Sequence, residues 1–451
     1  MTVQLPVFEE AAVVERLLEA VGRLDYPRDR LEVQVLDDSR DETTALVAAG
    51  VAALRAAGVE ASLLHRRERV GFKAGALAAG LARARGELLA VFDADFVPPP
   101  DFLRRTVPWF QDPRTGAVQA AWGHLNRRAS LLTRLQALLL DAHFQVEQTA
   151  RDRGRELVAF NGTAGVLRRA AIEDAGGWSA DTLTEDLDLA LRAQLCGWRF
   201  RFLPDLVVPA ELPSDARALL AQQRRWTRGA AATTRKLLRA VWTSPGVPLR
   251  GRLSGTAMLL QHAAWPLLLL LLFLSAAVAG REAPPPEWFS RAQGALFALA
   301  SGSVAAAWVA GQRARGWRGA LEALLLCPAL VALGFALCAG NTRAWALGLL
   351  RRPAPFERTP KRGEAEARYA ARGGGALAAA GLGLVALAAV VAALLRGRPA
   401  ATPLLMLMAL GPLSLAVRLA LRSGPSSGIR TASDPARTAS GPPLVIAASR
   451  D

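Results

Sequence analysis

Two carboxylates, Asp93 and Asp95, stand on either side of one small residue, directly after the apolar run 87–92. Like charges this close repel each other unless a cation or water screens them. Hard carboxylate oxygens with room for water suit Mg²⁺ or Mn²⁺ bridging a diphosphate. The pair therefore predicts a divalent metal site, and a solvated acidic loop is the alternative.

A second acidic cluster, residues 37–39, follows the β-rich run 31–36. A carboxylate such as Asp38 at the end of a strand can accept hydrogen bonds from a base or a ribose. Acidic turns also cap the helix that follows them, which is the alternative for this cluster.

A third group of polar residues begins a helical pattern at Thr184, with Glu185 and Asp186 in the first turn. The helix dipole stabilises a carboxylate there as the anion, so ordinary capping explains the pattern equally well. For catalysis, Asp186 has to lie against an acceptor hydroxyl, from which it takes a proton as general base.

The fourth group, residues 222–226, carries Gln222, Arg225 and Trp226. Arginine offers a planar fork for phosphate, and tryptophan offers a flat apolar face that stacks on a sugar ring. A basic interfacial helix with a tryptophan anchor is the alternative. The order of the four groups, followed by membrane segments, is a joint pattern that chance rarely supplies.

These residues belong to elements that alternate between strands and helices over residues 1–215. The runs 31–36 and 87–92 are typical of strands, and helical patterns cover 10–24 and 73–84. Such alternation predicts a parallel α/β sheet, whose ligands bind at the carboxyl ends of the strands. Both acidic clusters fall at such ends.

The charge divides unevenly along the 451 residues. Residues 1–215 hold 26 Lys and Arg against 31 Asp and Glu, whereas residues 216–451 hold 29 against 8. A nucleic-acid-binding protein carries its positive charge on the folded recognition domain. Here the positive charge flanks long apolar runs, which is typical of the cytosolic edge of a membrane protein and argues against a nucleic-acid partner.

The second half of the chain predicts a membrane region. Residues 216–255 are basic and amphipathic, as expected of an interfacial segment that contacts membrane lipids. Residues 423–451 are rich in Ser, Pro and Gly and predict a disordered tail. Between them lie five apolar runs, each near the roughly 20 residues that span a bilayer: 256–280, 293–312, 319–340, 376–396 and 402–422.

The loop 342–375 limits how many of these runs can cross. It holds 8 Lys and Arg against 3 Asp and Glu, and it would lie outside if all five runs crossed. That arrangement contradicts the positive-inside bias. The run 319–340 contains Glu322 and Pro328. We therefore expect this run to be re-entrant or interfacial, which leaves four spans and places the loop in the cytosol.

The joint pattern resembles the processive glycosyltransferases of family 2, the cellulose and hyaluronan synthase group. The resemblance is closest to the cellulose-synthase-like groups A and C, which make mannan, glucomannan and glucan backbones. It covers about residues 2–365 and rests on residues 34–39, 71–77, 92–96, 160–165, 176–178, 184–186 and 222–226. It implies an α/β, Rossmann-like type A glycosyltransferase domain followed by α-helical transmembrane segments.

The resemblance implies a role for each matched side chain. Asp38 would contact the nucleoside, Asp95 and Asp93 would hold the metal, and Asp186 would be the general base. The residues that bind the nucleotide sugar would be Asp38, Lys73, Asp93, Gln222 and Arg225. Those that bind the acceptor would be Trp226, Glu185, Phe160, Asn161, Gly162 and Thr163.

The segment 356–361 is similar to the gating loop of cellulose synthases. Phe356, Thr359 and Lys361 match that loop, and Arg358 stands where valine is usual. A gating role needs the loop in the cytosol, which supports four spans over five.

Two features depart from the family pattern. The family usually begins with a membrane helix ahead of its first strand, and Met1 stands at that strand, so we expect a misassigned start codon. Glu9 replaces the usual asparagine near the nucleotide site, so we expect a different base preference.

The resemblance implies an inverting, metal-dependent hexosyltransferase that uses Mg²⁺ or Mn²⁺. A nucleotide sugar of the UDP-glucose or GDP-mannose type would extend and translocate a β-linked polysaccharide. Its partners would be the donor, the growing glycan, membrane lipids and accessory export subunits. It would be a multi-pass protein of an inner membrane, of plasma or Golgi type, with a cytosolic catalytic domain. The alternatives are a glycolipid synthase of the ceramide glucosyltransferase kind, which adds one sugar to a lipid, and a non-catalytic export subunit.

Overall fold

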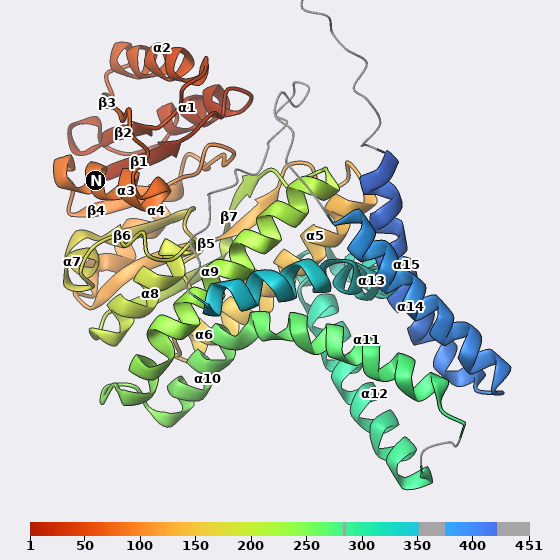
Figure 1. The fold of residues 1–451 in the computed structure, drawn as a ribbon. Coiled ribbons are helices and arrows are strands. Elements are labelled where there is room, and N and C mark those ends of the chain that lie inside the picture. The colour runs from red at the N-terminus through yellow and green to blue at the C-terminus, as the bar shows by residue number, and fades with distance from the viewer. Residues whose placement is uncertain (283–285, 351–374, 422–451) are drawn as a thin grey trace, which may run out of the picture.

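The computed structural model describes residues 1–282, 286–350 and 375–421. Figure 1 shows an α/β domain formed by the first half of the chain, beside a group of long helices formed by the second half. Most of the expected cytosolic loop 342–375 and the expected tail 423–451 lie outside the described residues.

The α/β domain is built on a seven-stranded sheet with the order β3-β2-β1-β4-β6-β5-β7. The strands are β1 (Thr2–Val7), β2 (Glu32–Asp37), β3 (Glu60–His65), β4 (Leu88–Val91), β5 (Thr115–His124), β6 (Gly165–Arg168) and β7 (Arg199–Ala210). The two runs expected to be strands are therefore β2 and β4. Successive side chains of these strands point to opposite faces of the sheet, and the hydrophobic ones fill the space on both faces.

The expectation of a fully parallel sheet is wrong at β6. Strands β1 to β4 and the pair β5 and β7 are parallel, whereas β6 is antiparallel to both of its neighbours. The reason is that Gly165, the first residue of β6, pairs with Val91, the last residue of β4. The loop before β6 delivers the chain at the carboxyl edge of the sheet, so β6 has to run away from that edge.

Helices cover both faces of the sheet. On one face, α1 (Val14–Gly22), α2 (Thr43–Ala56) and α4 (Phe102–Thr106) contribute to one hydrophobic core. On the other, α3 (Phe72–Arg83), α7 (Arg169–Asp174) and α8 (Glu185–Leu195) contribute to a second. The sheet is thus the middle of three layers, helix, sheet and helix. This arrangement leaves the carboxyl ends of the central strands open for a ligand.

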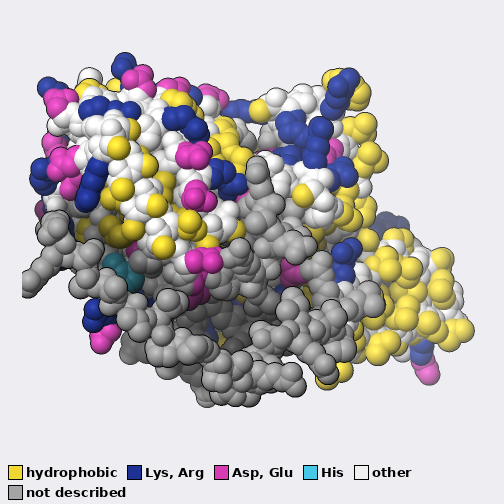
Figure 2. Space-filling model, turned by 90° about the horizontal axis from the view of Figure 1, so that it is seen from above, with side chains coloured by type: hydrophobic (Ala, Val, Ile, Leu, Met, Phe, Trp, Pro, Cys, Tyr) yellow, Lys and Arg dark blue, Asp and Glu magenta, His cyan; other side chains and the backbone are white. Residues whose placement is uncertain are grey.

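Five helical stretches of the described residues are long and apolar enough to cross a membrane: Leu249–Gly280, Glu287–Ala310, Arg313–Leu349, Ala376–Leu395 and Thr402–Ala420. The helices of this half are α9 (Ala216–Thr243), α10 (Leu249–Leu260), α11 (Ala264–Gly280), α12 (Glu287–Ala310), α13 (Gly316–Leu349), α14 (Ala376–Leu395) and α15 (Thr402–Leu421). Figure 2 shows hydrophobic side chains gathered on the projecting helices and charged ones spread over the α/β domain. The chain therefore carries a membrane region.

The apolar run 319–340 lies within one continuous helix, α13, of 34 residues. It passes Pro328 without the chain reversal of a re-entrant segment, and Glu322 near its start is paired with Arg134 at 2.9 Å. The helix continues to Leu349, so the loop begins later than expected. Such a helix can either span the membrane or lie at its interface. The number of spans and the domain boundaries therefore stay predictions.

A buried ionic cluster joins the α/β domain to the start of α13. Asp141, on α5 (Leu131–Ala142), lies 2.5 Å from Arg127 Nη1 and 3.0 Å from His124 Nε2. Its carboxylate also accepts a hydrogen bond of 3.0 Å from Gln312, next to α12. Burial opposes the charge of Asp141, but His124 and Arg127 outweigh it and hold the pKa of this carboxyl below its usual range.

We expect Asp141→Asn to destabilise the protein by about 3 kcal/mol, because it leaves Arg127 without its carboxylate in a buried site. The measurement is the midpoint of thermal unfolding of the full chain in detergent. Asp25→Asn is the matched control, because its partner Arg104, 2.7 Å away, and Asp25 itself are both more than half exposed. That variant should lose less than about 1 kcal/mol, and equal losses in the two variants would contradict a structural role for the cluster.

Candidate active site

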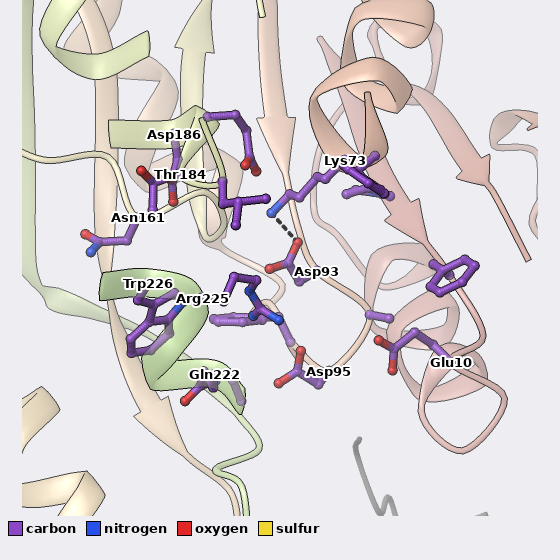
Figure 3. Close-up of a pocket in the computed structure, with 18 of the residues that line it drawn as sticks. Glu10, Lys73, Asp93, Asp95, Asn161, Thr184, Asp186, Gln222, Arg225 and Trp226 are labelled. Atoms are coloured by element: carbon purple, nitrogen blue, oxygen red, sulfur yellow. Dashed lines mark hydrogen bonds and ion pairs between the residues drawn. The ribbon is translucent and has the colours of Figure 1, made fainter. Parts of the chain in front are cut away.

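One cavity of about 210 Å³ lies at the carboxyl ends of the central strands, between α8 and α9. Figure 3 shows side chains from α3, α8, α9 and the end of β4 pointing into it. The cavity wall includes ten residues that the sequence predicted: Asp38, Lys73, Asp93, Asp95, Asn161, Glu185, Asp186, Gln222, Arg225 and Trp226. Residues almost 190 positions apart in the chain thus face the same space.

Lys73 is the cation at the centre of the acidic side of this cavity. Its Nζ lies 2.5 Å from Asp93 Oδ1 and donates a hydrogen bond of 2.9 Å to the carbonyl oxygen of Gly162. Burial disfavours the charge of this lysine, but Asp93, Glu185 and Asp186 outweigh burial and keep the pKa of Lys73 above its ordinary value. Lys73 therefore stays protonated, and its positive charge offsets the negative charges of the three carboxylates.

Asp186, in the first turn of α8, has a raised proton affinity. Burial and the nearby charge of Glu185 together raise the pKa of Asp186 to about 7, although Lys73 opposes the shift. Burial also raises the pKa of Glu185. A carboxylate that exchanges its proton near neutral pH is suited to general base chemistry.

Gly162 leaves the space that the Asp186 carboxylate occupies. Its φ is +79°, a conformation that favours glycine, and a Cβ atom at this position would lie 2.6 Å from Asp186 Oδ2. Glycine is therefore required here on two counts, the backbone conformation and the close approach of the carboxylate.

The remaining predicted acceptor residues, Phe160, Gly162 and Thr163, support the cavity from behind instead of lining it. Phe160 is 1% exposed and packs in the hydrophobic core under β6. Thr163 Oγ1 accepts a hydrogen bond of 2.9 Å from the backbone N–H of Asp93, which fixes the end of β4. Both side chains are buried, and their expected contact with an acceptor stays a prediction. The gating residues Phe356, Thr359 and Lys361 lie outside the described residues.

Asp38 is held by arginines that the sequence analysis missed. Arg66 donates to both of its carboxylate oxygens, at 2.7 and 2.6 Å, and Arg69 lies 3.6 Å away. The guanidinium of Arg69 also stacks 3.5 Å from the ring of Phe8, and burial lowers the pKa of Arg69 to about 10. The available signal was the basic run after β3, since β2 and β3 are parallel neighbours whose ends share one edge.

Asn161 is oriented by a second group that the sequence analysis missed. Its Nδ2 lies 3.2 Å from Nε2 of His143, and the other ring nitrogen of His143 lies 2.9 Å from Glu147. Both belong to a π-helical segment, His143–Gln148, a distortion that occurs frequently at functional sites. Burial opposes the charge of Glu147, but His143 and Arg151 outweigh burial and lower the pKa of Glu147 to about 2.

Asp93 and Asp95 have the chemistry to hold a divalent metal ion. Both line the cavity, and carboxylate oxygens are the hard ligands that Mg²⁺ and Mn²⁺ prefer. Within the described ranges, no group of three or more His, Cys, Asp and Glu side chains forms a metal site. The two carboxylates can therefore supply part of the ligand set of such an ion.

We expect Asp186→Asn to raise the midpoint of thermal unfolding in metal-free buffer at pH 8, because it removes a carboxylate whose ionised form is disfavoured in the folded state. The pKa of Asp186 is raised from the ordinary aspartate range to about 7, so the gain in stability should shrink as the pH falls from 8 towards 5. Asp38→Asn is the control and should destabilise, because it breaks the ion pair with Arg66. A loss of stability in Asp186→Asn at pH 8 would contradict the claim that the folded protein disfavours the ionised form of Asp186.

The chain is similar in sequence to known proteins. Residues 1–229 match the model of "Glycosyltransferase like family 2". Glucomannan 4-beta-mannosyltransferase 2 of Arabidopsis thaliana is 46% identical over 241 residues, which are 52% of this chain and 45% of the relative. Glucomannan 4-beta-mannosyltransferase 1 of Cyamopsis tetragonoloba is 43% identical over 256 residues, 56% of this chain and 49% of the relative. The matched region is thus about half the length of these relatives.

A solved structure shares the fold. It is a mannosyltransferase from Pyrobaculum calidifontis in complex with GDP-Man and Mn²⁺, with a TM-score of 0.50 and 26% identity, covering 70% of this chain and 87% of that chain. The type A glycosyltransferase fold expected from the sequence is therefore confirmed. With a glycosyltransferase domain over half its length, the chain belongs to the glycosyltransferase-like family 2, as its motifs predicted.

Proposed function

We propose that this chain is an inverting, metal-dependent membrane glycosyltransferase that transfers mannose from GDP-mannose to the end of a β-linked polysaccharide. The observation that carries the proposal is the single cavity in which Asp186, the Asp93 and Asp95 pair, and Arg225 meet. The choice of mannose is supported by the relatives named as glucomannan mannosyltransferases and by the structural neighbour that holds GDP-Man.

The donor end of the cavity is cationic and preorganised. Arg225 and Gln222 project from α9, so their side chains can hold the two phosphates of a nucleotide sugar. Asp38 is kept in place by Arg66 and faces the same cavity, where it can accept hydrogen bonds from the nucleoside. The phosphates and the nucleoside of the donor therefore each have a matching group.

Asp95 and Asp93 would hold the divalent ion that the family implies. When bound, such an ion neutralises the negative charge that develops on the departing diphosphate. Lys73 already lies against Asp93, so it keeps that carboxylate oriented and reduces the repulsion between the two acids.

Asp186 is the general base of the proposed reaction. It takes the proton from the acceptor hydroxyl, whose oxygen forms a bond to the anomeric carbon as the bond from that carbon to the phosphate oxygen breaks. Attack from the face opposite the leaving group converts an α-linked donor into a β-linked product. Trp226, on the same side of the cavity as Asp186, offers the flat face on which the acceptor sugar stacks.

The long apolar helices favour translocation of the glycan product across the bilayer. Five stretches of suitable length follow the catalytic domain, and α9 packs on α8 as well as on α13. We propose that the catalytic domain faces the cytosol and that the glycan is translocated beside these helices. A glycolipid synthase remains the second candidate, because the same cavity also suits a single transfer to a lipid.

We expect full-length protein in membrane vesicles to release GDP from GDP-mannose with Mn²⁺ or Mg²⁺, and to release much less in the presence of EDTA. The measurement is nucleotide release from a panel that includes GDP-mannose and UDP-glucose. UDP release from UDP-glucose in place of GDP release would overturn the mannose assignment. The size of the radiolabelled product separates a polymer from a single sugar on a lipid.

We expect Asp186→Asn to lower the turnover number by about a hundredfold to ten-thousandfold, the usual contribution of a general base. Binding of GDP should change little, because the base contacts the acceptor side. The matched control is Asp188→Asn, two residues along α8, where Asp188 is fully buried and paired with Lys236 at 2.8 Å. That variant should lose stability. Retained turnover in Asp186→Asn at full metal saturation would rule out this base.

We expect kcat/KM to rise as the pH increases from 6 to 8. The base acts when ionised, and the pKa of Asp186 is raised to about 7, so the active fraction grows across this range. The measurement is the pH profile of GDP release at fixed Mn²⁺. A profile that is flat from pH 5 to pH 8 would show that a group of ordinary carboxylate pKa controls the reaction instead.

A further inference from the structure

A second cavity, of about 580 Å³, lies beside the active site and is not explained by the proposed reaction. It is enclosed by α9, by the second half of α13, by the first two turns of α14 and by the last turns of α15. These helices pack against one another, so the cavity lies inside the helical region. Its volume falls in the usual range for a ligand pocket.

The chemistry of the described lining is restricted to four residue types. Every described residue that lines the cavity is Leu, Ala, Gly or Arg. A sugar chain is normally held by aromatic faces and by hydroxyl or amide groups. In the described part of this lining none of these is present, whereas guanidinium groups stand beside aliphatic walls. The lining therefore matches an amphiphile with an anionic head better than it matches a neutral glycan.

The arginines come from two helices and converge on the cavity. Arg224 and Arg228 are four residues apart on α9, which puts them on one face of that helix, and Arg343 projects from α13. Two glycines make room for Arg224. A Cβ atom at Gly340 would lie 3.0 Å from its Nε, and one at Gly375 would lie 3.2 Å from its Nη2.

The position of the cavity fits the head-group level of a membrane. Its walls are the ends of α13, α14 and α15 that lie next to α9, and all three helices belong to stretches long enough to span. Leu382 lines the cavity about two turns further along α14 than Gly375, and Leu415 lies about one turn further into α15 than Leu419. Arginines at the helix ends with leucines deeper in the bundle suit a phosphate group attached to acyl chains.

We propose that this cavity binds the head group of an anionic phospholipid, with its phosphate against Arg224, Arg228 and Arg343. Arg225 and Leu183 line both this cavity and the active site. A lipid bound here is therefore placed to hold the turn of α9 that carries Arg225 and Trp226. The inference goes beyond the proposed function and does not depend on the identity of the donor or of the glycan.

The test measures lipid binding to the full-length protein by native mass spectrometry after detergent exchange. Phosphatidic acid is compared with phosphatidylcholine, in which a cation offsets the phosphate charge. We expect one phosphatidic acid to bind at least about tenfold more tightly than phosphatidylcholine, and Arg228→Ala/Arg343→Ala to remove that preference. Arg228→Lys/Arg343→Lys keeps the charges and should keep most of the preference, which separates loss of charge from loss of fold.

Arg239→Ala is the matched control, because Arg239 is exposed on the same helix and does not line the cavity. It should bind phosphatidic acid like the unaltered protein. Equal binding of the two lipids, or an unchanged preference in the alanine double variant, would overturn the proposal. Displacement of the lipid by millimolar inorganic phosphate would show a free-anion site, and displacement by manno-oligosaccharides would show a glycan site. Lipid binding is measured without a nucleotide sugar. A failure of the protein to release GDP would therefore not change the outcome of this test.

Discussion

The contact between Lys73 and Asp93 is the interaction on which the active site depends. Asp93, Glu185 and Asp186 are three acids around one small cavity, and the nearby cations Lys73 and Arg225 offset their mutual repulsion. Lys73 extends from α3 and contacts Asp93 directly, and its second hydrogen bond, to Gly162, attaches the loop before β6. One ammonium group thus joins a helix, a strand end and a loop from three separate parts of the chain.

The residues behind the cavity explain why the carboxylates can approach so closely. Gly162 has no side chain where Asp186 needs space, and Thr163 fixes the backbone of Asp93 by a hydrogen bond. Phe160 fills the core below them. These residues do not line the cavity, yet they set the positions of those that do. A motif of consecutive residues therefore divides into one residue that faces the cavity, Asn161, and neighbours that support it.

Helix α9 connects the catalytic domain to the membrane region. Arg225 and Trp226 face the active site, while Arg224 and Arg228 line the second cavity among α13, α14 and α15. A shift of this helix would move the groups of both cavities together. The ionic cluster around Asp141 forms a second connection, between α5 and the start of α13. The orientation of the two halves is thus fixed by packing on one side and by paired charges on the other.

The sequence by itself determined the family, the strands that Asp38 and Asp93 follow, and the apolar stretches of the second half. These are local properties, because a strand, a helix or a membrane segment is specified by residue types at short spacing. Only the tertiary structure decided the direction of β6, the burial of Phe160, the continuity of α13 and the pairing of Asp38 with Arg66. Each of these depends on which distant segments pack together, and residue spacing along the chain does not specify such contacts.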